Sequence, residues 1–85
     1  MYTEFRRLIM ADIERYNQLL GEELRINRIL KKKSLQDVAD GLGLHKNTIG
    51  YYERGIIPMT ALTVKNYCDY LGIDYIEVFK KVSEK

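Results

Sequence analysis

Helical spacing of apolar residues runs through almost the whole chain and restricts its fold more than any other feature. Only one proline and six glycines interrupt the 85 residues. No stretch of strand length alternates Val, Ile or Thr with polar residues. Apolar residues instead recur at steps of three and four, which places them on one face of a helix. The pattern predicts an all-α protein.

The length and composition exclude several classes of protein. A chain of 85 residues buries only about 60% of the surface that its unfolded form exposes, so a two-domain enzyme or a large ligand cavity is not expected. The single Cys and single His disfavour a disulfide framework and a protein-only zinc site, and fit a reducing cytoplasm. No apolar run approaches the 18 or so residues of a membrane span. We expect a cytoplasmic protein without metal, cofactor, membrane contact or an evident small-molecule ligand.

Six segments have helical spacing, and capping residues or glycines separate them. Ser34, Thr60 and Asp74 are suited to cap the helices that follow them. Gly21 weakens a helix by about 1 kcal/mol relative to Ala, which indicates a break. The predicted helices cover about residues 3–19, 21–32, 35–42, 46–54, 61–71 and 75–82. We therefore expect an N-terminal helical extension (1–19) and a five-helix domain (20–85).

The segment from Leu35 to Gly55 has the spacing of a helix-turn-helix motif. Ala39 is small where the second helix would cross the first, and Gly43 tolerates the unusual φ of a tight turn. Ile49 and Tyr52 supply apolar residues that face the first helix. The remaining predicted members of this shared core are Val38, Leu42 and Leu44. We expect Tyr52, Tyr67 and Tyr75 to pack in or near the core with their hydroxyls at the surface.

This stretch resembles the lambda-repressor-like helix-turn-helix family, also called the xenobiotic-response-element (XRE) family. The likeness covers about residues 20–80 and rests on three pieces, LGEELRINR, SLQDVADGLGLHKNTIGYYERG and CDYLGID. Each piece is weak alone, but their order and spacing match the family. The resemblance implies a five-helix domain, with an extra N-terminal amphipathic helix in this chain. It also implies binding of double-stranded DNA by a transcription regulator, with residues 45–54 in the major groove.

The outer face of residues 45–54 has chemistry that suits DNA. Asn47 can form a bidentate pair with adenine, and Lys46 can reach guanine or phosphate. Thr48 offers a hydroxyl and a methyl group, while Tyr51 can hydrogen-bond phosphate. An ordinary polar surface helix is the alternative interpretation of this face. The candidate DNA-binding residues are Ser34, Gln36, His45, Lys46, Asn47, Thr48, Gly50, Tyr51 and Arg54.

The resemblance implies one structural pair, Arg28 with Glu53. In the family an Arg of the first core helix bridges the Glu that ends the recognition helix. A partly buried bidentate pair would position that helix rather than take part in any catalysis. Carboxylates elsewhere are scattered without an acid–base dyad, so we expect no enzyme.

The chain departs from the family pattern in four places. Gly50 lies within the expected recognition helix, where it either permits close approach to DNA or is simply a weak position. Leu35 stands where many phage repressors have a phosphate-binding Gln, so Ser34 and the helix-start N–H groups are expected to take that role. Lys32 occupies a turn position that is often Gly. The loop over residues 56–59 is apolar rather than basic, which could mark an interface.

Two features leave the partner open. The basic run from Arg25 to Lys33 contains no acidic residue, and it is either a solvated helix end or a phosphate-facing patch. The stripe in residues 1–19 must pack on the chain's own core, on a second subunit or on another protein, because a lone helix of this length is marginal. The steps of four, three and four from Ile9 through Ile13 and Tyr16 to Leu20 favour a homodimer. The rival hypothesis is a protein-interaction module that does not read DNA. The stripe consists of Tyr2, Phe5, Ile9, Ile13 and Tyr16, and Leu20 continues it.

Overall fold

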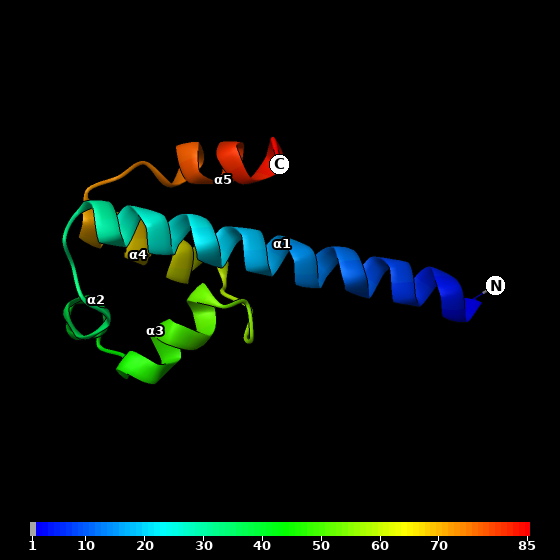
Figure 1. Cartoon of the computed structure of the whole chain (residues 1–85), viewed down its shortest axis with the longest axis horizontal. Helices are drawn as coiled ribbons and strands as arrows, with labels where there is room; N and C mark the ends of the chain where they lie inside the picture. Colours follow the sequence, from blue (N-terminus) through cyan, green and yellow to red (C-terminus); the bar gives the residue numbers. More distant parts are fainter. Residues whose placement is uncertain (1) are drawn as a thin grey trace.

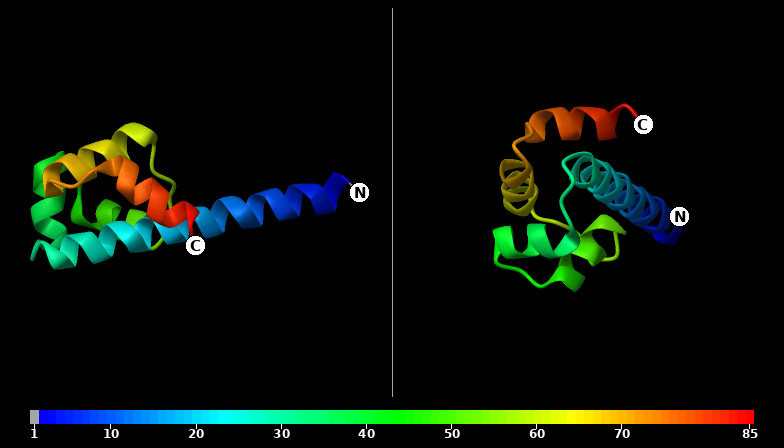
Figure 2. Two further views of the ribbon diagram at one scale, coloured as in Figure 1. Left: turned by 90° about the horizontal axis from the view of Figure 1, so that it is seen from above. Right: turned by 60° about the vertical axis from the view of Figure 1, so that its left-hand side comes forward.

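The computed structural model describes the backbone of residues 2–85 and the side chains of residues 10–85. Within that part it contains five helices and no strands, which confirms the predicted all-α class (Figure 1). The helices are α1 (Tyr2–Leu30), α2 (Leu35–Leu42), α3 (Lys46–Glu53), α4 (Ala61–Leu71) and α5 (Tyr75–Ser83). Helices α2–α5 and the C-terminal half of α1 form a compact unit, which we call the body, and the N-terminal half of α1 projects from it (Figures 1 and 2). The molecule measures 46 × 25 × 19 Å.

The helix break predicted at Gly21 is wrong. The two N-terminal segments form one continuous helix of 29 residues. The described structure therefore has five helices where the sequence predicted six. Gly21 is buried, and an added Cβ would meet the backbone carbonyls of Tyr52 and Glu53. The glycine is therefore needed for close packing of α1 against the end of α3. The division into residues 1–19 and 20–85 stays a prediction.

The core lies between α1, α4, α5 and the two short helices α2 and α3. Leu24, Val38, Ala39, Ile49, Tyr67 and Cys68 are all fully buried. Helix α1 packs against α3, α4 and α5, while α2 packs against α3 and α4 (Figure 2). The remaining buried apolar residues are Leu20, Val64, Leu71, Val78 and Val82.

The projecting half of α1 keeps an exposed apolar face. Met10, Ile13 and Tyr16 are exposed, Ile13 by 48%. Packing on the chain's own core is therefore wrong for these residues. Tyr2, Phe5 and Ile9 lie outside the residues whose side chains are described. Across residues 2–85, no helix combines the length and the apolar character needed to cross a membrane.

The predicted caps are confirmed. The Ser34 hydroxyl accepts the Asp37 N–H while the Asp37 carboxylate accepts the Ser34 N–H, which makes a capping box. Thr60 and Asp74 cap α4 and α5. Gly43 and Gly72 end α2 and α4 with φ of 69° and 72°, in the left-handed region that glycine adopts at little cost.

Three predicted environments differ in the structure. Leu44 is 38% exposed rather than part of the shared core. Met59 packs against the core, so only part of the 56–59 loop is an apolar surface, with Ile56 58% exposed. The Tyr67 hydroxyl was expected at the surface, but Tyr67 is fully buried.

Candidate nucleic-acid interface

Helices α2 and α3 form the helix-turn-helix that the sequence predicted. They pack directly against each other, with Ala39 and Ile49 fully buried. The chain reverses at Gly43, whose left-handed conformation ends α2 and leaves only Leu44 between it and His45, the N-cap of α3. The outer side of α3 is thereby left open to solvent (Figure 1).

Four candidate residues lie on one exposed face of α3 and its C-cap. Asn47, Gly50, Tyr51 and Arg54 are spaced i, i+3, i+4 and i+7, so they share one side of the helix. Asn47, Tyr51 and Arg54 are exposed and Gly50 is half-buried. Lys46 and Thr48 flank this face, the first exposed and the second half-buried. We call the six residues Lys46, Asn47, Thr48, Gly50, Tyr51 and Arg54 the α3 face; their contact with DNA stays a prediction.

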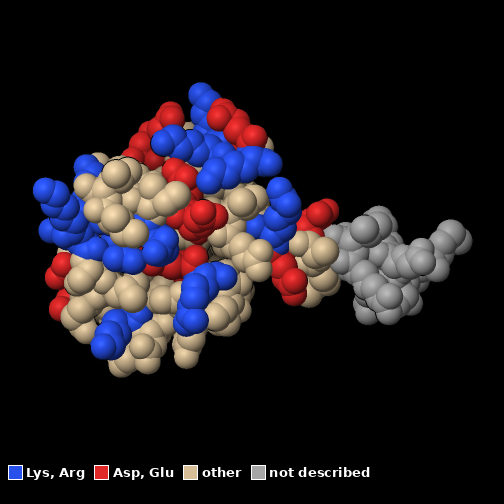
Figure 3. All heavy atoms as spheres, viewed as in Figure 1, with Lys and Arg blue, Asp and Glu red and all other residues tan. Residues whose placement is uncertain are grey.

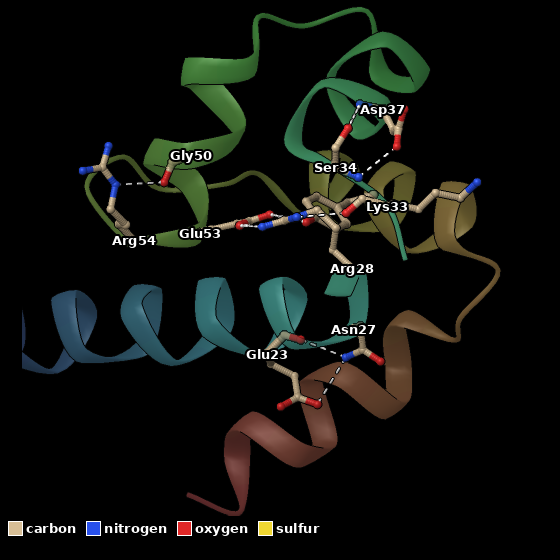
Figure 4. Close-up of polar contacts among 10 residues, drawn as sticks. Glu23, Asn27, Arg28, Lys33, Ser34, Asp37, Gly50, Glu53 and Arg54 are labelled. Atoms are coloured by element: carbon tan, nitrogen blue, oxygen red, sulfur yellow. Dashed lines mark hydrogen bonds and ion pairs between the residues drawn. The ribbon is translucent and has the colours of Figure 1, made fainter. Parts of the chain in front are cut away.

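Arg54 and Tyr51 are held together at the end of this face. The Arg54 Nε donates to the Gly50 carbonyl oxygen at 3.3 Å (Figure 4). Its guanidinium carbon lies 5.3 Å from the centre of the Tyr51 ring, within the range of a cation–π contact. The two side chains therefore present a cation and a hydroxyl as one arranged pair.

Gly50 faces open space. A Cβ added there would meet no atom within 4 Å, in contrast to the crowded Gly21. The missing side chain thus has no role in packing the protein itself. Close approach of DNA at Gly50 stays a prediction.

His45, one of the predicted DNA-binding residues, caps α3. Its Nδ1 accepts the backbone N–H of Asn47 at 3.0 Å. An imidazole nitrogen that accepts carries no proton, so the neutral ring has its proton on Nε2. That N–H can donate outward at the beginning of α3.

The α2 candidates are already engaged within their own helix. Ser34 takes part in the capping box, and its hydroxyl proton stays free to donate. The Gln36 amide donates to the Asp40 carboxylate at 2.8 Å. The hydrogen bond from the Ser34 backbone N–H lowers the pKa of Asp37, which keeps a negative charge at the N-terminus of α2.

A buried ion pair ties the end of α3 to α1. The Arg28 Nε and Nη2 donate to the two Glu53 carboxylate oxygens at 2.8 and 2.9 Å. The two side chains are only 11% and 4% exposed. The hydrogen bond to Glu53 raises the pKa of Arg28. Arg28 Nη1 also donates to the Lys33 carbonyl at 2.9 Å, so one guanidinium links the end of α1 to the end of α3 and to the turn that leads into α2 (Figure 4).

Sequence reasoning missed two polar residues of the interior. The Tyr67 hydroxyl of α4 donates to Glu53. The one sequence signal for this hydrogen bond was that Tyr67 is on the inner face of its helix and that Glu53 was expected to be partly buried. Glu23 is also buried. Lys85 Nζ lies 3.4 Å from its carboxylate and Lys81 Nζ 3.8 Å, which ties the end of α5 to α1.

Basic side chains lie on several sides of the body. Figure 3 shows Lys and Arg over the end of the body where α1 meets α2, along its lower edge near α2 and α3, and over α5 at its upper side. Among residues 10–85, no group of three or more His, Cys, Asp or Glu side chains could hold a metal ion. Burial raises the pKa of Cys68 to about 11, so its thiol is a core residue rather than a nucleophile.

Comparison with known proteins gives the family. A family model described as helix-turn-helix matches residues 24–78, well over half of the chain. The crystal structure of the clp gene regulator ClgR from C. glutamicum has the same fold, with a TM-score of 0.77 and 22% identity over 81% of this chain and 90% of that chain. No curated protein matches significantly. The chain belongs to the XRE family of helix-turn-helix transcription regulators.

Proposed function

We propose that this protein binds specific sequences of double-stranded DNA as a homodimer in the cytoplasm, as a small phage- or mobile-element-type repressor or controller. The observation that carries the proposal is the α3 face. It joins an amide, a lysine and a Tyr–Arg pair on an exposed helix whose inner side is fixed by Ile49 and Glu53. Family membership and the fold shared with the regulator ClgR support it.

The order of groups on α3 favours sequence reading over simple phosphate binding. Asn47 stands in the first turn, where recognition helices contact base edges. Lys46, the Nε2 proton of His45 and the N–H groups at the start of α2 are candidate phosphate partners. Phosphate contacts set the register on the duplex and Asn47 reads one base.

Binding of a fluorescent duplex of random sequence, across a salt series, separates DNA binding from the rival interaction module. We expect affinity to fall steeply with salt, with a slope of about 0.9 for each phosphate contact on logarithmic axes. A matched variant with Lys46 and Arg54 both changed to Gln keeps the helix and should have a shallower slope. No binding by the wild-type protein even at low salt would favour a protein-interaction module.

The exposed face of α1 supports a homodimer. Met10, Ile13 and Tyr16 continue the helix face that Leu20 and Leu24 bury in the body. Apolar residues that extend a buried face beyond the body are suited to a second copy of the same helix. A dimer is also needed functionally, because a single module of this size reads only a short half-site.

Pairing through α1 would also hold two recognition helices apart at a fixed distance. The same helix packs against the end of α3 at Gly21 and against the following turn, where Gln18 lies beside Gly55. Helix α1 has no break between these contacts and Ile13. The proposed dimer contact is therefore rigidly connected to α3 through α1. The spacing of the DNA half-sites should therefore depend on α1.

Sedimentation equilibrium tests this assignment. Ile13→Glu places a charge in the proposed interface and should weaken self-association by at least about tenfold. The control is Leu62→Glu, since Leu62 is also exposed but lies on α4. Equal association by both variants would exclude the α1 face as the dimer interface.

A further inference from the structure

Helix α3 and helix α4 do not approach each other through their backbones. No Cα of α3 lies within 8 Å of a Cα of α4. The long side chain of Tyr67 nevertheless reaches from α4 to the carboxylate of Glu53, the last residue of α3. The hydroxyl is thus a polar link between α4 and the end of the expected recognition helix.

The Glu53 carboxylate receives donors from two directions. Arg28 of α1 binds both oxygens, and Tyr67 donates to Oε2, the oxygen that also accepts from Arg28 Nε. The bidentate pair with Arg28 keeps the Glu53 carboxylate in the plane of the guanidinium group. It still allows α3 to tilt about the axis that joins the two groups. A second donor from another helix opposes this tilt.

We propose that Tyr67 is a positioning residue for DNA recognition, whose hydroxyl sets the orientation of α3 through Glu53. This inference rests on the function proposed above. It extends the Arg28–Glu53 pair to a triad in which α1 and α4 together orient the α3 face. The hydrogen bond from Arg28 to the Lys33 carbonyl also holds the turn that precedes α2.

The surroundings keep the hydroxyl in its donating form. Tyr67 is fully buried, and burial, followed by the hydrogen bond to Glu53, raises its pKa far above neutral pH. Every buried side-chain nitrogen and oxygen among the described residues has a hydrogen-bond partner. Loss of the Tyr67 hydroxyl would take one donor from a carboxylate that solvent barely reaches.

Tyr67→Phe tests the proposal because it keeps the ring packing and removes only the hydroxyl. The matched control is Tyr70→Phe, one turn further along α4, where the half-buried ring packs on Gly41. With both variants folded, we expect Tyr67→Phe to weaken binding by about tenfold or more. The duplex for this measurement is the sequence that the wild-type protein enriches from a random library. Binding to random duplex should stay unchanged, because no charge is altered.

Amide hydrogen exchange gives a readout that does not depend on DNA. The N–H groups of Arg54, Gly55 and Ile56 bond to carbonyls of α3, and they should exchange faster in Tyr67→Phe while Val64 in α4 does not. Equal acceleration of all four would mean a general loss of stability and would overturn the positioning role. Unchanged exchange and unchanged specific affinity would overturn it too.

The outcomes separate this inference from the proposed function. If the wild-type protein prefers no sequence, the proposed function fails and the exchange pattern alone decides whether Tyr67 orients α3. If Tyr67→Phe does not fold, the wild-type NMR spectrum decides instead. A slowly exchanging hydroxyl proton of Tyr67 supports the link, and its absence contradicts it.

Discussion

Gly21 of α1 lies directly against the backbone carbonyl of Tyr52 at the end of α3. A glycine in the middle of a 29-residue helix costs about 1 kcal/mol of helix propensity, and here the cost permits a contact. The absence of a Cβ lets α1 approach the end of α3 closely. Helix α1 therefore supports α3 by shape at Gly21 and by charge at Arg28.

We predict that the two helical glycines respond oppositely to alanine. Gly21→Ala should destabilise the fold by about 1–3 kcal/mol, because the added methyl meets backbone atoms that cannot move aside. Gly50→Ala should stabilise it by about 0.5–1 kcal/mol, since open space surrounds that position. Urea unfolding of both variants measures this, and changes of the same sign would contradict the packing described.

Arg28→Ala should destabilise the protein by about 3–5 kcal/mol, because it leaves the buried Glu53 carboxylate without its ionic partner. Arg25→Ala is the control, since Arg25 lies on the same helix and is exposed. That change should stay within about 0.5 kcal/mol. A small loss for Arg28→Ala in the denaturation midpoint would mean that the pair is solvated.

The capping box predicts a specific pH dependence. The Ser34 N–H lowers the folded-state pKa of Asp37, so its stabilising contribution is fully present above the pKa of an unfolded Asp, about 3.9. The contribution is lost as the pH falls through the lower folded-state pKa. Asp37→Asn keeps an acceptor but cannot titrate, so its unfolding free energy should fall less steeply below about pH 4. Parallel curves for both proteins would show that the hydrogen bond contributes nothing.

Lys46 and Arg54 should act on DNA through charge. Changing either to Gln should lower affinity for every duplex and reduce the salt slope by about one, if each contacts a phosphate. Lys65→Gln on α4 is the control, because Lys65 pairs with Asp69 away from the α3 face. A variant that changes only one base preference would identify its residue as a base reader instead.

Local patterns along the chain were enough to predict most helices and caps. The spacing around Ala39, Gly43 and Ile49 identified the motif because two short helices that cross closely require a small residue at the crossing, a glycine in the turn and an apolar residue between them. The prediction of a helix break at Gly21 was wrong because the glycine is needed for a contact with α3, more than thirty residues away. Helix propensity carries no information about that contact. Tyr67 was misplaced for a similar reason. Its periodicity indicates a buried ring, while its hydroxyl partner depends on how α4 lies relative to Glu53.

The most direct test of the central claim is selection of bound sequences from a random duplex library by wild-type protein and by Asn47→Ala. The proposal predicts that wild type enriches two half-sites related by two-fold symmetry. The variant should bind the enriched site about 1–3 kcal/mol more weakly and lose the preference at one position of each half-site. Enrichment of no sequence by the wild-type protein, or an identical preference in the variant, would contradict the claim that the α3 face reads DNA.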